Sequence, residues 1–270
     1  MKFKNMKKIF LVIFVGLLFF SPEAKAQLFL EEGKKVHTIA PGERVTGSLM
    51  VNNTSERTIR IKAYWEDFQY ISPFDGAKKF LPAGTAEKSF SSWAVFKPRE
   101  FELVPYGKVK IDYTFDVPEN ATGGYYGVLF FENITDSFVD KTGVNVVTRA
   151  GCLFFLEPEN KNKRSAVENI VIENDTVKGE IVNEGDVVLI PSGTYYVLNR
   201  ENVAQDRGEI NKLYLPPDGR GNFSFKIKDF LAIGDFTAVV TFDLDGDVIV
   251  REIDFSKDIS GHIKLLNVRE

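Results

Sequence analysis

Hydrophobic and polar residues alternate over short stretches along most of the chain beyond residue 26. In Arg57–Phe68, Ile59 and Ile61 share one face of an extended chain. The opposite face carries Arg60 and Lys62. This period of two predicts a half-buried β-strand. The stretches with related β-rich patterns in the first half of the chain are Glu43–Asn53, Ser91–Pro98, Lys108–Pro118, Gly123–Asn133 and Val144–Pro158.

The β-rich pattern stops at Pro158–Ser165, which is polar and lacks apolar periodicity, and then restarts. The second series comprises Ser165–Asn174, Thr176–Asn183, Ser192–Asn199, Glu209–Leu215, Gly221–Lys228, Gly234–Leu244 and Asp247–Phe255. About seven short strands on each side of a linker are typical of β-sandwiches. We therefore predict an all-β fold of two tandem immunoglobulin-like β-sandwiches, at 27–158 and 159–270. Residues 262–270 form either an extra strand or a loose tail.

The first 26 residues have the three parts of a secretory signal peptide. A lysine-rich start precedes the apolar run Ile9–Phe20, and Ala24-Lys25-Ala26 supplies a small-residue cleavage site. The run is shorter than the roughly 20 residues of a membrane span, so cleavage is favoured over an uncut anchor. No cysteine for a lipid anchor follows, and no later run is long enough to span a bilayer. We expect a periplasmic or secreted protein without stable membrane insertion.

Charge narrows the range of partners. The sequence has 34 basic and 38 acidic residues, and removal of five lysines and one glutamate with the signal peptide leaves 29 and 37. A net charge near −8 argues against nucleic acid and anionic membranes, because both need a basic face. We therefore predict no nucleic-acid partner.

The candidate catalytic residues are few. The chain has one cysteine, Cys152, and two histidines, His37 and His262. Cys152 lies in an apolar strand, where a free cysteine usually acts as a small buried hydrophobic residue. Neither a zinc site nor a cysteine–histidine nucleophile has enough ligands in suitable places. A glycosidase carboxylate pair is the weakest alternative, because nothing sets two carboxylates at a defined separation. We predict no enzyme, no metal and no cofactor.

Two further motifs have a structural and a functional interpretation. The acidic run Asp243–Asp247 invites a calcium interpretation, but its glycine does not match a calcium loop, and Asp245-Gly246 favours a hairpin turn. Tyr125-Tyr126 follows Gly123-Gly124. This pair is either an aromatic binding patch or part of a packed strand, and glycines at a strand start allow a close backbone approach. We favour the packed strand.

Val144–Pro158 is the stretch on which the functional prediction depends. The residues of one parity are mostly apolar and should face a core; they are Val144, Val146, Thr148, Ala150, Cys152, Phe154 and Leu156. The other parity is mixed at first and apolar later. We predict that the later half is buried on both faces, against the second sandwich, and that the early half is a sheet edge. That edge either is guarded by Arg149 and the acidic Glu132, Asp136 and Asp140, or donates its backbone to another chain.

Several features together resemble the N-terminal domain of the PapD-like periplasmic pilus-assembly chaperones. Pro41-Gly42 leads into a strand that ends at Asn53, and a strand with Trp65 follows. Phe101–Pro105 comes next, and the strand ending in Leu153–Pro158 lies at the predicted domain boundary, similar to the closing strand of that family. A second sandwich follows, as in the family.

The same region also resembles the Gram-positive surface proteins that interact with WxL-type cell-wall proteins. The similarity lies in Asn53-Thr54-Ser55 at a strand end and in the spacing of Pro118 and the glycines up to Gly127. An alternative role, which the acidic and tyrosine-rich surface motivates, is that of an extracellular structural or adhesion module that binds surface proteins or a cell-wall polymer through a sheet face.

The chaperone resemblance implies β-strand addition to exported protein subunits, in which an edge strand supplies main-chain hydrogen bonds and alternate side chains. It places the apolar donor positions at Val144, Val146 and Thr148. The basic residue that holds the subunit's terminal carboxylate in the family falls on Leu153, which is a departure. Arg149, on the same strand face, is the candidate to supply that charge.

Overall fold

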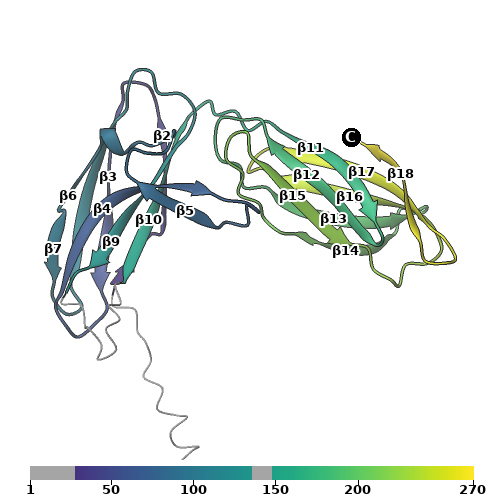
Figure 1. Ribbon diagram of the computed structural model, residues 1–270, viewed down its shortest axis with the longest axis horizontal. Coiled ribbons are helices and arrows are strands. Elements are labelled where there is room, and N and C mark those ends of the chain that lie inside the picture. The colour runs from purple at the N-terminus through teal and green to yellow at the C-terminus, as the bar shows by residue number, and fades with distance from the viewer. Residues whose placement is uncertain (1–27, 136–147) are drawn as a thin grey trace, which may run out of the picture.

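The computed structural model describes residues 28–135 and 148–270, and it shows two β-sandwiches joined end to end at an angle (Figure 1). The fold class is as predicted. The strands of the first sandwich are β1 (Leu28–Leu30), β2 (Lys34–Ile39), β3 (Arg44–Asn53), β4 (Ile59–Tyr70), β5 (Lys78–Pro82), β6 (Ala94–Lys97), β7 (Glu100–Leu103), β8 (Lys108–Asp116), β9 (Tyr125–Asn133) and β10 (Arg149–Pro158). A short 3₁₀ turn, η1 (Ser91–Trp93), precedes β6. The predicted signal peptide lies outside the described residues.

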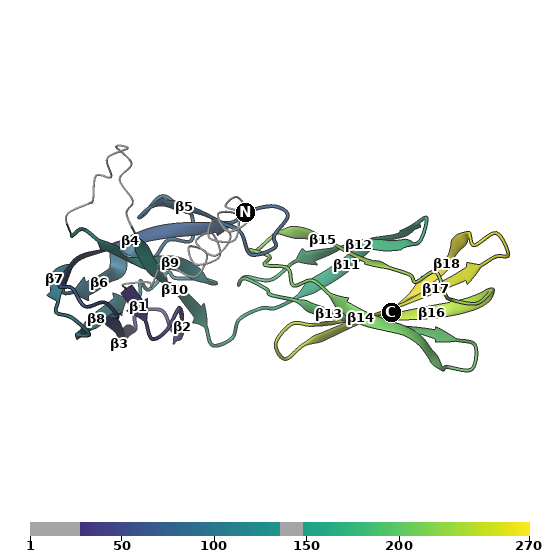
Figure 2. The same cartoon turned by 90° about the horizontal axis from the view of Figure 1, so that it is seen from below.

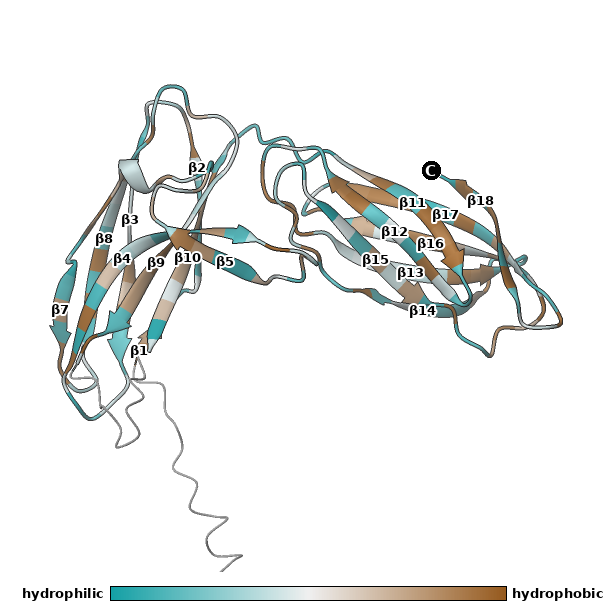
Figure 3. Ribbon diagram, in the orientation of Figure 1, coloured by the Kyte–Doolittle hydropathy of each residue, from teal (hydrophilic) through white to brown (hydrophobic). Residues whose placement is uncertain are grey.

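Two sheets face each other in the first sandwich. One has the order β1-β3-β8-β6, and the other has the order β2-β10-β9-β4-β5, with β7 also paired to β4. Trp65 of β4 lies in the aromatic core between them, with its ring centroid 5.1 Å from that of Phe154 and 5.2 Å from that of Phe90. The alternation of apolar residues along the strands supplies this core, which appears as hydrophobic bands on the ribbon in Figure 3.

The second sandwich contains β11 (Ser165–Glu173), β12 (Thr176–Asn183), β13 (Ser192–Asn199), β14 (Ala204–Ile210), β15 (Arg220–Lys226), β16 (Gly234–Asp243), β17 (Val248–Lys257) and β18 (Ile263–Arg269). Its sheets have the orders β11-β12-β15 and β14-β13-β16-β17-β18. Of the two alternatives for residues 262–270, the extra strand is confirmed: β18 pairs with β17.

One predicted strand of the second sandwich is wrong. The sequence pattern suggested a strand at Glu209–Leu215, but β14 ends at Ile210 and Leu215 makes only an isolated bridge with Leu189. The apolar residues Leu213 and Leu215 are buried without belonging to a longer strand. Buried apolar side chains of a loop therefore gave the same alternating pattern in the sequence as a strand would.

The two sandwiches share one arrangement of buried polar contacts, which lies at the end of β3 in the first and of β12 in the second. Asn53 and Asn183 are both almost fully buried, and each Nδ2 donates hydrogen bonds to carbonyl groups of two separate loops. Each Oδ1 accepts a bond from the backbone N–H two residues later. A buried asparagine therefore fixes the same loop junction twice.

Candidate functional site

The early part of β10 is an open sheet edge within the described residues. On one side, β10 pairs with β9 from Arg149 to Leu156; on the other, β2 pairs with it only from Leu153 onward. Thr148 accepts a bond from Asn133 of β9, and Leu153 donates one to Gly33 on the opposite side. Because backbone groups alternate in direction along a strand, Arg149 and Gly151 direct their N–H and C=O groups away from β9. Among the described strands, none pairs with that side of these two residues.

The four predicted site residues fall differently on this edge. Thr148 and Arg149 are exposed at its start. Val144 and Val146 lie outside the described residues, as do Asp136 and Asp140. The partner-binding role of this set therefore stays a prediction, for which the described edge supplies a geometric basis.

The later half of β10 is covered on both faces, as the sequence pattern predicted. Cys152, Phe154 and Leu156 are fully buried in the core of the first sandwich. On the opposite face, Phe155 packs into a second aromatic cluster, which consists of Phe68, Tyr70, Tyr126, Val128, Phe130 and Phe155. Val188 and Tyr214 of the second sandwich pack against this cluster.

Arg149 is held above the face of its own sheet. Its guanidinium carbon lies 4.0 Å from the ring centroid of Phe130, and Nη1 lies 2.9 Å from Oε1 of Glu66. The side-chain hydrogen bond from the guanidinium to Tyr64, together with the nearby Glu66, raises the pKa of Arg149. The charge of Arg149 is thus paired with a carboxylate of its own sheet.

A basic residue does stand beside Leu153, where the family resemblance looks for one. Lys34 of β2 is the register partner of Leu153, and its Nζ lies 4.5 Å above the ring centroid of Phe155. Sequence reasoning missed Lys34 because β2 and β10, which pair in parallel, are separated by more than a hundred residues along the chain. No local pattern around Lys34 reports that pairing.

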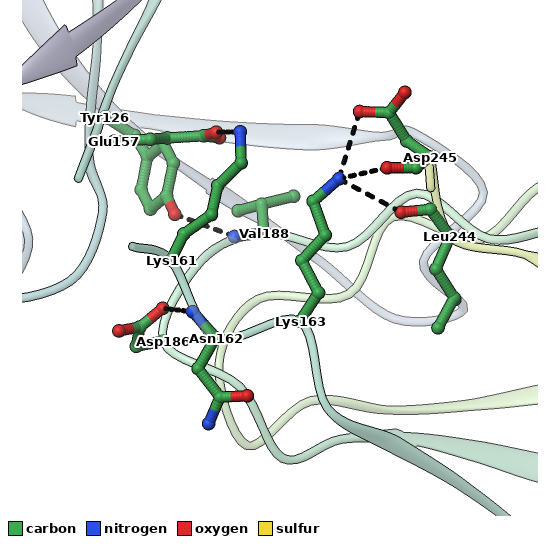
Figure 4. A network of polar contacts seen from close by, with 9 residues as sticks. All are labelled: Tyr126, Glu157, Lys161, Asn162, Lys163, Asp186, Val188, Leu244 and Asp245. Carbon is green, nitrogen blue, oxygen red and sulfur yellow. Dashed lines mark hydrogen bonds and ion pairs between the residues drawn. The ribbon is translucent and has the colours of Figure 1, made fainter. Parts of the chain in front are cut away.

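Polar contacts tie the linker to both sandwiches (Figure 4). Glu157 forms an ion pair with Lys161 at 2.7 Å, and the backbone N–H of Asn162 donates to Asp186 at 2.9 Å. Lys163 reaches the turn between β16 and β17, 3.2 Å from the carbonyl oxygen of Leu244. The polar residues between β10 and β11 are thus tied to their surroundings by hydrogen bonds and ion pairs.

Tyr126 connects the two sandwiches directly. Its hydroxyl oxygen accepts a hydrogen bond from the backbone N–H of Val188 at 2.7 Å. Gly123 has a φ of 69°, and Gly124 donates to the carbonyl oxygen of Asp186 at 2.9 Å. The glycines before the tyrosine pair therefore permit a close backbone approach. Both tyrosines belong to the packed strand β9, and Tyr126 is buried rather than partly in solvent as predicted.

A second contact comes from the loop between β4 and β5, which reaches the second sandwich in both views (Figures 1 and 2). The carbonyl oxygen of Phe74 accepts a bond from the backbone N–H of Tyr214 at 2.8 Å. Lys78 lies over the rings of Tyr70 and Tyr214. Two separate contacts therefore orient the second sandwich relative to the open edge.

The groups with catalytic potential are engaged in packing. Burial raises the pKa of the Cys152 thiol to about 12, which leaves it protonated at neutral pH. The fold brings His37 onto β2 beside β10, yet its Nε2 lies 3.0 Å from the Tyr113 hydroxyl, and burial lowers its pKa. Asp243–Asp247 forms the predicted hairpin turn between β16 and β17. Among residues 28–135 and 148–270, no group of three or more potential ligands gathers to hold a metal ion.

Comparison with known proteins supports the fold. No protein-family model matches the chain, and no curated protein matches its sequence. The solved structure of the class 5 fimbrial chaperone CfaA is similar, with a TM-score of 0.52 and 14% sequence identity over 83% of this chain and 97% of that one. A chaperone–tip adhesin complex of CFA/I fimbriae contains a chain with a TM-score of 0.53 at the same identity and coverage.

The described residues contain no helix with the length and apolar character of a membrane span. The resemblance to WxL-interacting proteins stays a prediction. The resemblance to PapD-like chaperones agrees with the two tandem sandwiches and with the similarity to both fimbrial chaperone structures. The chain therefore has the two-domain PapD-like fold of the fimbrial chaperones.

Proposed function

We propose that this protein is an exported, non-catalytic chaperone that binds β-rich envelope or pilus subunits by β-strand addition. The observation that carries the proposal is the open edge of β10 at Arg149–Cys152, where Arg149 and Gly151 direct backbone groups outward. A strand added there gains main-chain hydrogen bonds, and the preceding residues Val144, Val146 and Thr148 supply its apolar contacts. The predicted signal peptide places this encounter in the periplasm or outside the cell.

Lys34 is the residue we assign to hold the partner's terminal carboxylate. It is exposed and stands in register with Leu153, immediately beyond the open part of the edge. Arg149 keeps its ion pair with Glu66 and guards the edge until a partner arrives. In this arrangement the anchoring charge comes from the neighbouring strand.

The proposal is tested by removing one backbone donor from the edge. Arg149→Pro deletes an N–H that points away from β9, while Arg149→Ala removes the same side chain and keeps that N–H. We expect Arg149→Pro and Val146→Asp to abolish co-purification of an exported β-rich protein from the native envelope, and Arg149→Ala to retain it. Equal capture by the proline and alanine variants would exclude strand addition at this edge.

A companion assay addresses the alternative of a wall-binding adhesion module. Purified cell wall is incubated with the protein, and the bound fraction is compared with that of a scrambled-charge variant. Wall enrichment that survives Arg149→Pro would favour the adhesion module. Loss of subunit capture without wall enrichment would favour the chaperone.

A further inference from the structure

Three large apolar side chains project from the end of the second sandwich that lies away from the first. Phe230 is 68% exposed, Ile233 is 64% exposed and Ile259 is 89% exposed. Phe230 and Ile233 belong to the loop between β15 and β16, and Ile259 belongs to the loop between β17 and β18. We call these three residues the apolar tip.

The strand register places both loops at one end. β16 and β17 pair from Gly234 with Lys257 to Asp243 with Val248, and the turn beyond Asp243 contacts the linker through Lys163. The residues before Gly234 and after Lys257 therefore lie at the opposite end, which Figure 1 shows as the free end of the second sandwich. The apolar tip is thus remote from the open edge of β10.

Both loops are held in place, so the exposure of the tip is built into the fold. Leu231 is buried in the core while its neighbour Phe230 points outward. Lys257 ties the two loops together by donating to the carbonyl oxygens of Asp229 and Leu231 at 2.7 and 2.9 Å. Oδ1 of Asp258 accepts bonds from the backbone N–H groups of Ser260 and His262, each at 2.9 Å, and presents Ile259 at the turn.

The charged neighbours of the tip are largely paired with one another. Lys226 lies 2.8 Å from Asp175, Lys228 lies 2.7 Å from Asp206, and Arg200 is paired with Asp235. This mixed set provides no concentrated field of one sign for a charged partner. The attraction at this end of the molecule is therefore mainly apolar.

We propose that the apolar tip docks reversibly into the interfacial layer of an uncharged lipid bilayer. A stable protein interface uses roughly 20–30 residues from each partner, and three side chains on projecting loops fall far short of that. A lipid interface needs no complementary shape and accepts single apolar or aromatic side chains. This inference does not depend on strand addition at β10.

The test uses the chain without its predicted signal peptide and floats it with phosphatidylcholine vesicles. Burying one such side chain is worth roughly ten- to a hundredfold in partitioning, so the combined variant Phe230→Ser, Ile233→Ser, Ile259→Ser should lose vesicle binding. Val248→Ser is the matched control, because Val248 is 60% exposed at the other end of the same sheet. The Val248→Ser variant should bind vesicles like the unaltered chain. Both variants should have the same melting temperature as the unaltered chain.

A second measurement reports insertion itself. Both native tryptophans lie in the first sandwich, and a Phe230→Trp chain should show an added blue shift of emission when vesicles are present. Failure of the unaltered chain to float, or flotation of the triple variant, would overturn the proposal. Binding only after phosphatidylglycerol is added, or loss of a protein partner by the triple variant without any vesicle binding, would also overturn it.

Discussion

The ring of Tyr70 in the first sandwich stacks on the ring of Tyr214 in the second, with centroids 5.2 Å apart and planes 29° from parallel. Lys78 lies above both rings, and burial raises the pKa of Tyr70. This contact and the linker network lie on different parts of the boundary between the sandwiches. Together they define the orientation in which the open edge of β10 is presented.

Tyr214→Ala is expected to loosen that orientation. It removes the stacked pair and part of the cluster around Phe155, with a cost of about 1–3 kcal/mol in the free energy of unfolding. Small-angle X-ray scattering should show a broader distribution of overall dimensions. Tyr196→Ala is the control, since Tyr196 is 44% exposed on the second sandwich. Equal scattering profiles for the two variants would show that the stack does not set the angle.

Asn183→Ala should destabilise the second sandwich strongly. The buried Nδ2 donates to the carbonyl oxygens of Val187 and Leu215, and alanine leaves both acceptors without that donor. The expected loss is about 2–4 kcal/mol in urea unfolding. The exposed Asn222 serves as the control, for which alanine should change the stability by less than about 0.5 kcal/mol. A near-neutral Asn183→Ala would mean that water replaces the amide at no cost.

Comparing Gly123→Ala with Gly261→Ala should distinguish the effect of a steric clash from that of backbone strain. A Cβ at Gly123 would lie 2.8 Å from the carbonyl oxygen of Asp186, whereas a Cβ at Gly261 would meet no atom within 4 Å. Both glycines have positive φ, so alanine strains the backbone at either site. Gly123→Ala should therefore lower the free energy of unfolding by about 1–3 kcal/mol more than Gly261→Ala. Matching values would argue that the approach to Asp186 adjusts freely.

Cys152 should resist thiol reagents in the folded protein. Because burial raises its pKa from 9.0 to about 12, the thiol stays protonated at pH 8 while the unfolded chain begins to ionise. The unfolded state binds fewer protons between these two values, so this group's contribution lowers stability as pH rises from about 9 to 12. Ellman's reagent should label Cys152 only after urea is added, and fast labelling of the native chain would contradict the buried environment.

The sequence pattern predicted those features of the fold that depend on residues close together in the sequence. Alternation located the strands around Ile59 and the burial of Phe155, because both follow from a period of two along one strand. It could not reveal that β2 pairs in parallel with β10, since that contact joins distant parts of the chain. Lys34 was missed for this reason.

The linker shows a related limit. Its polar residues indicated only a connection between the sandwiches. Hydrogen bonds to the carbonyl of Leu244 or the carboxylate of Asp186 produce no periodic pattern in the sequence. The displaced strand near Leu213 has the same origin, since a buried loop and a strand can share one apolar pattern. Contacts made by irregular backbone are set by tertiary structure.

The parallel pairing of β2 with β10 also constrains the order in which the protein acquires its structure. β1 joins one sheet through β3, while β2 crosses to the other and pairs with the strand that closes the sandwich. Synthesis from the N-terminus produces Lys34–Ile39 long before Leu153–Pro158. The first sandwich cannot close during that interval, so its early strands await their partner as an unfinished sheet.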